Sequence, residues 1–317
     1  MSILALSLAF VLDSVAILSA EQQQKAQADE MKRLMIQTNA HKPARRSIYY
    51  HHMYAQLLKP FRHEPDLTLL EIGANTGESL HLWAAYFPNI KSIYGVRWGI
   101  TDKQMKPCTA GDVCGKIHLI DADQSKHSHL QSVVVKSLGS LKFSLDMASL
   151  SWVGTGYGVV IDDGSHIPRH MLLTFQTLWP YVRPGGVYIL EDIGFSYSDR
   201  PGKIYGYTIG DGGVGKPSPG NLVEKFKQLA DVVARPWCMP RANFTVFTRE
   251  VDSTIWSVQF VSGVIIVQKQ TADQQMMLQS VERDLIHLYG GHHLYAGPSA
   301  AEYREALEHE DRSWDAS

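Results

Sequence analysis

Two pairs of adjacent carboxylates are the most chemically informative feature of this sequence. Asp162 and Asp163 lie in VVIDDGSHIPRH, and Glu191 and Asp192 lie in PGGVYILEDI. Each pair follows an apolar run rich in β-branched residues, so each is expected at the carboxyl end of a buried parallel strand, where open α/β sheets place their ligand crevice. Gathered carboxylates repel one another, and a divalent cation is the simplest relief. The pairs therefore predict a metal site; the alternative is that they only cap the helix and the turn that follow.

A histidine lies close to the first acidic pair. His166 follows Asp163 by three residues, beyond a glycine, so both side chains can face the crevice. A positioned general base contributes roughly 10²- to 10⁴-fold to a rate, and His166 is suited to that role. His170 comes four residues later, but Pro168 between them is expected to start a helix. We therefore expect His170 on the face of that helix, because imidazole suits magnesium less well than oxygen does.

The composition predicts one medium-sized α/β domain with appendages. The 317 residues exceed the roughly 200 to 250 that such a core needs. The chain has 30 Lys and Arg residues, 32 Asp and Glu residues and a formal net charge of −2. Its basic residues are scattered, so a small molecule is the expected partner and nucleic acid is not. Of the three cysteines, Cys108 and Cys114 either form a bridge within one loop or are two unpaired thiols.

Short apolar runs alternate with helical segments through the middle of the chain. Strands are expected at residues 67–72, 92–96, 116–120, 159–161 and 187–190. Helices such as 78–86 and 170–179 lie between them, which predicts right-handed crossovers and a doubly wound, Rossmann-like sheet that is mainly parallel. Two later runs, 254–260 and 263–269, are separated by two residues. They predict an antiparallel pair at the sheet edge.

Further segments surround this core. Residues 45–58 are expected to form a helix that covers the site or its entrance, with bulky positions at Tyr49, Tyr50, Tyr54 and Leu58. Residues 194–220 are rich in Gly and aromatic residues and lack an apolar period, which predicts a lid. The lid tyrosines, which either line an acceptor or only anchor the lid, are Tyr197, Tyr205 and Tyr207. A helix is expected at 221–233. The expected divisions of the chain are a leader and linker (1–44), a core domain (45–270) and a helical extension with a tail (271–317).

The first twenty residues, MSILALSLAFVLDSVAILSA, are mostly apolar. They resemble a signal peptide or a short membrane anchor, but no basic residue precedes the apolar run and Asp13 interrupts it. Entry into the secretory pathway, where Asn243 would be a glycosylation site, and a cytoplasmic location therefore remain alternatives. A spanning helix is disfavoured because it needs about 20 apolar residues without a central charge. The N-terminal helices either mediate contacts in a homo-oligomer or fold over their own site.

The segment EIGANTGES joins the first core strand to the first core helix. Gly73 and Gly77 let the backbone pass close to a nucleotide-like ligand, and the next helix directs its N-terminus into the same crevice. The spacing is Gly-x-x-x-Gly rather than the Gly-x-Gly-x-x-Gly of dinucleotide binders, and Glu71 precedes it on the strand. A tight turn would explain the glycines alone. The combination resembles motif one of class I S-adenosylmethionine-dependent methyltransferases.

Other segments extend this resemblance over about residues 65 to 270. LLEIGANTGESLHLWAAYFPN, IYGV, DADQS, VVIDDGSHIPRH, TFQTLWPYVRPGGVYILEDI, SYSD and IWSVQFVSGVIIVQK follow one another in this order. Together they are similar to the macrocin and mycinamicin type of sugar O-methyltransferases. The resemblance implies a class I methyltransferase fold with S-adenosylmethionine and Mg²⁺, or another hard divalent cation, as cofactors. It also implies that the partner is a small-molecule hydroxyl acceptor, with a glycosyl group expected.

The matching motif positions imply a role for each site residue. The implied magnesium ligands are Asp163, Glu191 and Asp192. The implied catalytic residues are His166 as the base and Asp163. The residues assigned to the donor pocket are Glu71, Gly73, Asn75, Gly77, Arg97, Asp123, Gln124 and Asp162. Asp162 has an alternative position on the other side of the strand tip, because neighbours on a strand point in opposite directions.

One residue departs from the family pattern. Methyltransferases usually place an acidic residue at the tip of the second strand, where it accepts hydrogen bonds from the ribose, and Arg97 stands there instead. An arginine at this tip suits a 2′-phosphate, which keeps an NADP-dependent oxidoreductase as an alternative function. Arg97 may instead pair with a nearby acid or stack on adenine. A further alternative is a non-catalytic binding protein that retains the scaffold.

The expected chemistry follows from these residues. A sugar hydroxyl is a poor nucleophile at neutral pH, so its proton must leave as the oxygen attacks the sulfonium methyl. A hard cation bound by oxygen ligands keeps positions open for substrate and polarises a bound hydroxyl. We therefore expect two vicinal substrate oxygens at the cation and proton transfer to His166.

Overall fold

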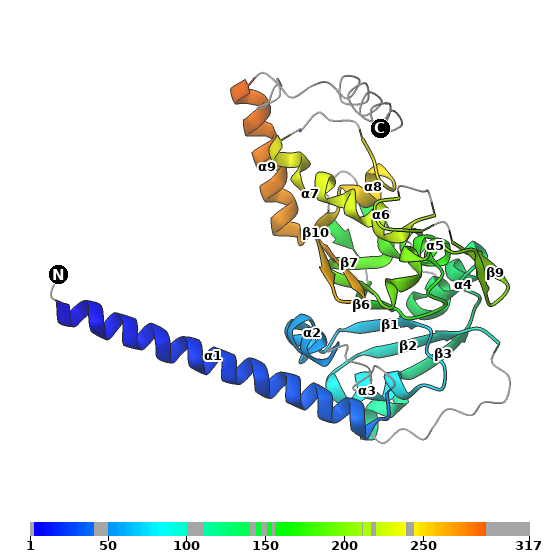
Figure 1. Cartoon of the computed structure of the whole chain (residues 1–317), viewed down its shortest axis with the longest axis horizontal. Coiled ribbons are helices and arrows are strands. Elements are labelled where there is room, and N and C mark those ends of the chain that lie inside the picture. Colours follow the sequence, from blue (N-terminus) through cyan, green and yellow to red (C-terminus); the bar gives the residue numbers. More distant parts are fainter. Residues whose placement is uncertain are drawn as a thin grey trace.

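A seven-stranded sheet forms the centre of the protein in this computed structural model (Figure 1). Its strands are β1 (Thr68–Ile72), β2 (Ser92–Arg97), β3 (Ile117–Asp121), β6 (Tyr157–Asp162), β7 (Val182–Leu190), β10 (Ile255–Val261) and β11 (Val264–Lys269). Their order is β10-β11-β7-β6-β1-β2-β3. The five strands from β7 to β3 are parallel, while β11 is antiparallel to β7 and to the edge strand β10. The predicted Rossmann-like sheet with an antiparallel edge pair is confirmed.

The structure describes most of the chain. The described residues are 3–40, 50–99, 111–139, 144–146, 151–153, 156–210, 212–216, 220–238 and 244–289. Some sequence predictions fall outside these ranges, and they concern Tyr49, Cys108, Asn243, His292 and His293. Cys114 is disulfide-bonded, so the alternative of an unpaired thiol is wrong for this residue.

Helices cover both faces of the sheet. On one face lie α4 (His127–Leu138), α5 (Pro168–Leu178), α6 (Leu222–Lys227) and α7 (Leu229–Cys238). On the other face lie α1 (Ile3–Gln37), α2 (Tyr50–Leu57) and α3 (Glu78–Tyr86). Successive strand residues point to opposite faces, so Leu70 packs with the first group and Leu69 with the second. The apolar runs of the sequence are continuous because both faces are buried.

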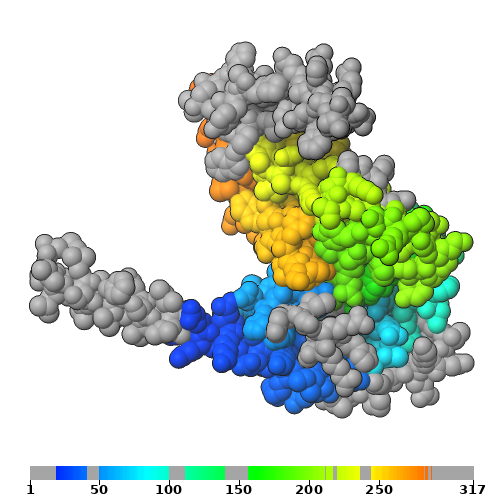
Figure 2. Space-filling view, in the orientation of Figure 1, coloured from blue at the N-terminus to red at the C-terminus, as the bar shows by residue number. Residues whose placement is uncertain are grey.

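Shorter elements complete the fold. They are η1 (Lys59–Phe61), η2 (Gly111–Lys116), η3 (Trp179–Tyr181), η4 (Ile193–Tyr197), α8 (Arg249–Asp252) and α9 (Ala272–Tyr289). Two small hairpins are β4 (Ser144–Asp146) with β5 (Ser151–Val153), and β8 (Gly202–Ile204) with β9 (Tyr207–Ile209). In Figure 2 the orange segment that contains β10 and β11 meets the lighter blue segment that contains α2.

The element boundaries differ from the sequence predictions in three places. β7 begins at Val182 rather than near Val187, because the Pro-Gly-Gly segment forms an irregularity inside the strand, where the register with β6 shifts. The helix predicted at 221–233 is two helices, α6 and α7. The proposed lid contains the β8–β9 hairpin, which the lack of an apolar period did not predict.

The helix α1 is joined to the domain through its C-terminal part and extends away from it toward the N-terminus (Figure 1). Ala28, Met31 and Met35 are buried against the second face of the sheet. Arg62 donates two hydrogen bonds to Glu30, at 2.7 and 2.6 Å. Among the described residues, no helix combines the length and the apolar character that crossing a membrane requires.

We expect Met31→Ala to destabilise the protein by about 2 to 5 kcal/mol, because Met31 is fully buried between α1 and the domain. Ile36→Ala is the matched control on the same helix, since 63% of Ile36 is exposed; its expected effect is within about 0.5 kcal/mol. Urea unfolding measures both. Equal effects of the two substitutions would contradict the packing of α1 on the domain.

Candidate functional site

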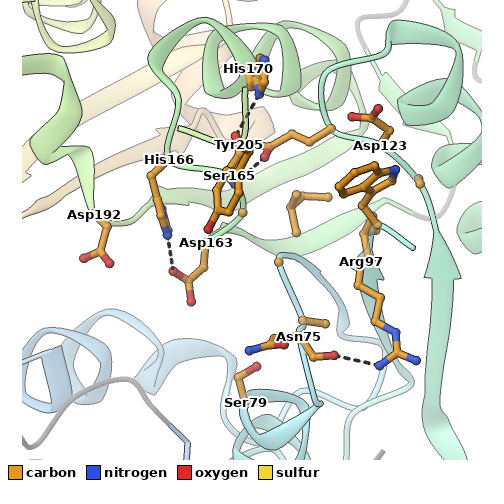
Figure 3. A pocket seen from close by; sticks show the side chains of 18 of the residues that line it. Asn75, Ser79, Arg97, Asp123, Asp163, Ser165, His166, His170, Asp192 and Tyr205 are labelled. Atoms are coloured by element: carbon orange, nitrogen blue, oxygen red, sulfur yellow. Dashed lines mark hydrogen bonds and ion pairs between the residues drawn. The ribbon is translucent and has the colours of Figure 1, made fainter. Parts of the chain in front are cut away.

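A cavity of about 860 Å³ lies at the carboxyl ends of the parallel strands. The chain runs from β1 to β2 and β3 on one side and reaches β6 and β7 on the other, so the strand order switches between β1 and β6. Ligands of open α/β sheets bind at such a switch point. Figure 3 shows side chains from the β1–α3 loop, the end of β2 and the β6–α5 loop directed into this space.

The glycine loop after β1 is fixed against the loop that carries Asp163. Gly73 has φ +97°, and a Cβ there would lie 2.0 Å from the carbonyl oxygen of Asp163. The amide of Asp163 donates to the carbonyl of Ile72 at 2.9 Å. Gly77 has φ +87° and precedes the first residue of α3, so the helix N-terminus opens beside the cavity. Glycine is therefore required at Gly73 by the close approach of two backbones.

Arg97 supports the same loop. It lies at the end of β2 and lines the cavity. Its Nη1 donates to the carbonyl oxygen of Asn75 at 2.9 Å (Figure 3). The sequence suggested a phosphate, an acid or adenine as the partner of this guanidinium, and the structure shows the glycine-loop carbonyl instead. Arg97 therefore holds the backbone at which the amino-acid end of a donor is expected.

Asp123 and Gln124 follow β3 and line the cavity beside the glycine loop. Burial opposes ionisation of Asp123, but hydrogen bonds from the Ser125 hydroxyl at 2.6 Å and the Ser125 amide at 2.9 Å outweigh it and lower the pKa of Asp123. Asp123 is therefore an anionic acceptor in this part of the cavity at neutral pH.

Asp162 lies behind the cavity rather than in its lining. It is fully buried, and it accepts hydrogen bonds from Gln124 Nε2 at 2.7 Å and from the Tyr188 hydroxyl at 3.5 Å. Gln124 Oε1 in turn accepts from the Ser165 amide at 2.8 Å. Burial raises the pKa of Asp162 to about 7. The residue therefore holds Gln124, and through it the loop that follows β6.

Asp163, His166 and Asp192 form a cluster at the other end of the cavity. Each offers one ligand atom, and these atoms lie within 4.8 Å of one another. His166 Nε2 is 4.0 Å from Asp163 Oδ1 (Figure 3). The first acidic pair is thus divided between two environments, because Asp162 faces the interior and Asp163 the cavity. This division follows from the alternation of side chains at the end of a strand.

The second acidic pair contacts α2. The Tyr50 hydroxyl donates to Asp192 Oδ1 at 3.0 Å, and the Tyr54 hydroxyl donates to Glu191 Oε1. Burial, followed by the charges of Asp192 and Glu191, raises the pKa of Tyr50 above its usual range, so its hydroxyl keeps its proton. Glu191 is 2% exposed and is not part of the three-residue cluster. Its role as a metal ligand stays a prediction.

Backbone strain is concentrated around the cavity. Among the described residues, the non-glycine residues with positive φ are Asn39 (53°), Asn75 (41°), His166 (57°), Asp192 (51°) and Tyr205 (50°). Four of the five line the cavity. Asn and Asp adopt this conformation at modest cost, but for other residues it costs of order 1 to 3 kcal/mol. The strain at His166 and Tyr205 therefore points to a constraint other than stability at this site.

The β8–β9 hairpin closes one side of the cavity. The Tyr207 hydroxyl lies 3.1 Å from Ser125 Oγ, and its ring packs edge-on against His170 with ring centroids 4.4 Å apart. His170 Nδ1 lies 3.0 Å from Ser165 Oγ, so His170 belongs to the support of the β6–α5 loop, as expected, and not to the three-residue cluster. Tyr205 lines the cavity although 73% of it is exposed.

The cavity brings together most of the residues singled out from the sequence. Those in its lining are Gly73, Asn75, Arg97, Asp123, Gln124, Asp163, His166 and Asp192. Those outside the lining are Glu71, Gly77, Asp162 and Glu191. Glu71 is buried and accepts a hydrogen bond from Trp83 Nε1 at 3.0 Å. Sequence reasoning missed Trp98 and Ser165, which line the cavity, and the contacts of Tyr50 and Tyr54 with the acids.

Comparisons with known proteins agree with this geometry. A crystal structure of the MycE methyltransferase from the mycinamycin biosynthetic pathway, in complex with Mg and SAH, aligns with 76% of this chain and 53% of its own, with a TM-score of 0.54 and 24% identity. The chain has the class I methyltransferase fold. A second crystal form of the same enzyme gives a TM-score of 0.55. No family model matches the sequence.

Two curated relatives share stretches of sequence with this methyltransferase fold. The 8-demethyl-8-alpha-L-rhamnosyl tetracenomycin-C 2'-O-methyltransferase of Streptomyces olivaceus is 32% identical over 151 residues, which are 45% of this chain and 33% of that protein. The mycinamicin VI 2''-O-methyltransferase of Micromonospora griseorubida is 29% identical over 173 residues, 50% of this chain and 36% of that protein. The chain thus spans about one third of the length of the curated relatives it matches. The resemblance predicted from the motifs is confirmed.

We expect Asp162→Asn to change the pH dependence of stability. The pKa of Asp162 rises from 3.8 to about 7 on folding, so the folded protein binds the extra proton between these values. The free energy of unfolding of the wild type therefore falls as pH rises from about 4 to about 7, by up to about 1.4 kcal/mol per pH unit from this group, and is unaffected by it above pH 7. The amide of Asn carries no charge and lacks this dependence.

Urea unfolding of both proteins at pH 5 and pH 8, in chelator, measures the effect. The stability of the variant relative to the wild type should be higher at pH 8 than at pH 5. A difference that is the same at both pH values would contradict a protonated Asp162 in the folded protein.

Proposed function

We propose that this protein is a metal-dependent O-methyltransferase that transfers a methyl group from S-adenosylmethionine to a hydroxyl of a small molecule, with a glycosyl group as the acceptor. The observation that carries the proposal is the convergence of Asp163, His166 and Asp192 in the cavity that the glycine loop also lines. The printed names of the relatives support it, because they describe O-methyltransferases of rhamnosyl tetracenomycin and mycinamicin substrates.

The donor would lie along the glycine loop. Gly73 leaves room at the crossing of two backbones, and Asn75 lines the cavity in a loop held by Arg97. At the far end, Asp123 and Gln124 offer an anionic carboxylate and an amide for the adenosine part. These positions together span one face of the cavity, from the N-terminus of α3 to the segment after β3.

The residues of the cluster fit a hard divalent cation. Mg²⁺ prefers carboxylate and water oxygens, and two of the three cluster residues are aspartates. Asp163 and Asp192 would hold the cation, and Glu191 is the third predicted ligand. When bound, the cation polarises the acceptor hydroxyl as a Lewis acid, and the donor supplies the methyl group.

His166 would take the proton that the acceptor oxygen releases. Its Nε2 points toward Asp163 at 4.0 Å, at the edge of the cluster. Its strained backbone, with φ 57°, directs the imidazole into the cavity (Figure 3). The exposed ring of Tyr205 lies on the same side of the cavity and offers an apolar face to a sugar or an aromatic group.

Ligand binding separates this proposal from its alternatives. Calorimetry with S-adenosylmethionine, S-adenosylhomocysteine and NADPH should show binding of the first two and none of NADPH. Binding of NADPH alone would favour the oxidoreductase suggested by Arg97. An absence of heat with all three would favour a non-catalytic binding protein.

Asp163→Asn should abolish methyl transfer, because an amide binds a divalent cation far more weakly than a carboxylate does. Binding of S-adenosylhomocysteine should be retained, since the donor loop keeps its backbone contacts. Transfer of the labelled methyl group to a set of glycosylated acceptors measures the first effect, and calorimetry measures the second. Full activity of the wild type in excess chelator would exclude a role for the metal.

His166→Ala should lower the rate by about 10²- to 10⁴-fold and remove a titration near neutral pH from the rate profile. His63→Ala is the control, since this exposed histidine lies outside the cavity lining and should leave the profile unchanged. An unchanged pH profile in His166→Ala would assign the base to another residue.

A further inference from the structure

The helix α2 presents two tyrosine hydroxyls to the second acidic pair. Tyr50 and Tyr54 are four residues apart, so their side chains lie on the same face of the helix. The Tyr50 hydroxyl donates to Asp192 at 3.0 Å, and the Tyr54 hydroxyl donates to the adjacent Glu191. Two successive acids at the exit of β7 are thus matched by two successive turns of one helix.

Packing fixes the Tyr54 hydroxyl. Tyr54 is fully buried, and its ring lies 5.0 Å from the ring of Trp83 on α3. Trp83 is itself held by a hydrogen bond from its Nε1 to Glu71 Oε2 at 3.0 Å. The ring of Tyr54 therefore lies between the buried carboxylates of β1 and β7, and its hydroxyl is directed at Glu191.

The Tyr50 hydroxyl is fixed by the turn between β10 and β11. Tyr50 is 3% exposed, and a Cβ added at Gly263 in this turn would lie 3.0 Å from its hydroxyl oxygen. The carbonyl of Gly263 accepts a hydrogen bond from the Ile193 amide at 3.2 Å, next to Asp192. The edge hairpin, α2 and the exit of β7 therefore meet at one point, where Figure 2 shows the orange and lighter blue segments in contact.

We propose that Tyr50 and Tyr54 are positioning residues that hold Asp192 and Glu191 for the divalent cation, so that α2 is part of the metal centre. The inference rests on the proposed function. Each hydroxyl binds one oxygen of its carboxylate, which leaves the second oxygen of that carboxylate for the cation. Hydrogen bonds of this kind orient metal ligands, and their loss typically lowers metal affinity about 10- to 100-fold.

A purely structural role would give a different result. A buried carboxylate without a donor is costly, so a tyrosine that only satisfies Glu191 would affect stability and leave the affinity for metal unchanged. Metal affinity, measured in the absence of turnover, therefore separates the two roles. The tyrosines touch the carboxylates and not the reacting atoms, so an effect on activity alone would not separate them.

The test uses the full chain and the conservative variants Tyr50→Phe and Tyr54→Phe. Mn²⁺ is titrated in the presence of S-adenosylhomocysteine, and the free ion is followed by electron paramagnetic resonance; Mg²⁺ is titrated by calorimetry. Tyr86→Phe is the matched control, because Tyr86 is 2% exposed on α3 and packs against Phe87, outside the cavity lining. Circular dichroism in chelator checks that each variant is folded.

We expect the Kd for Mn²⁺ to rise about 10- to 100-fold in each of the two variants and to stay unchanged in Tyr86→Phe, with S-adenosylhomocysteine bound as in the wild type. If the wild type binds metal and both variants bind it equally well, the positioning role is wrong and the proposed function stands. If the wild type binds no metal, both are wrong. Should Tyr54→Phe fail to fold, Tyr50→Phe decides, since its partner Asp192 is exposed.

Discussion

Repulsion between carboxylates at the ends of two neighbouring strands is the constraint on which this site depends. The structure treats each acid differently. Asp162 is buried on an amide, and burial raises its pKa to about 7. Glu191 and Asp192 accept hydrogen bonds from tyrosines of α2, and Asp163 faces the cavity beside His166. Negative charge is thereby concentrated on the side that faces the donor loop, where a cation relieves it.

The remaining architecture keeps these acids in place. The β1 and β6 exit loops are joined by backbone contacts at Gly73, so the donor loop and the loop of Asp163 cannot move independently. A network from Asp162 through Gln124 to Ser165 supports the second loop from below. Strained backbone at His166 is held by this rigid surrounding, which is typical of functional sites. Site geometry here is a consequence of interlocked loops on a stiff sheet.

The sequence predicted the sheet and most of the cavity lining, because burial on both faces imposes continuous apolar runs and parallel strands carry their ligands at the carboxyl ends. It did not predict the partner of Arg97, which is a backbone carbonyl and leaves no sequence signature. The contacts of Tyr50 and Tyr54 join positions more than 130 residues apart, although their four-residue spacing on an expected helix was a usable signal. The β8–β9 hairpin was missed because its strands are too short to show alternation.

A crystal structure of the protein with S-adenosylhomocysteine and Mn²⁺ tests the metal centre most directly, since Mn²⁺ is located by its anomalous scattering. A peak should lie about 2 Å from carboxylate oxygens of Asp163 and Asp192, beside the donor sulfur. Carboxylates neutralised by lysine or arginine side chains, with no peak between them, would contradict a metal-dependent methyl transfer at this site.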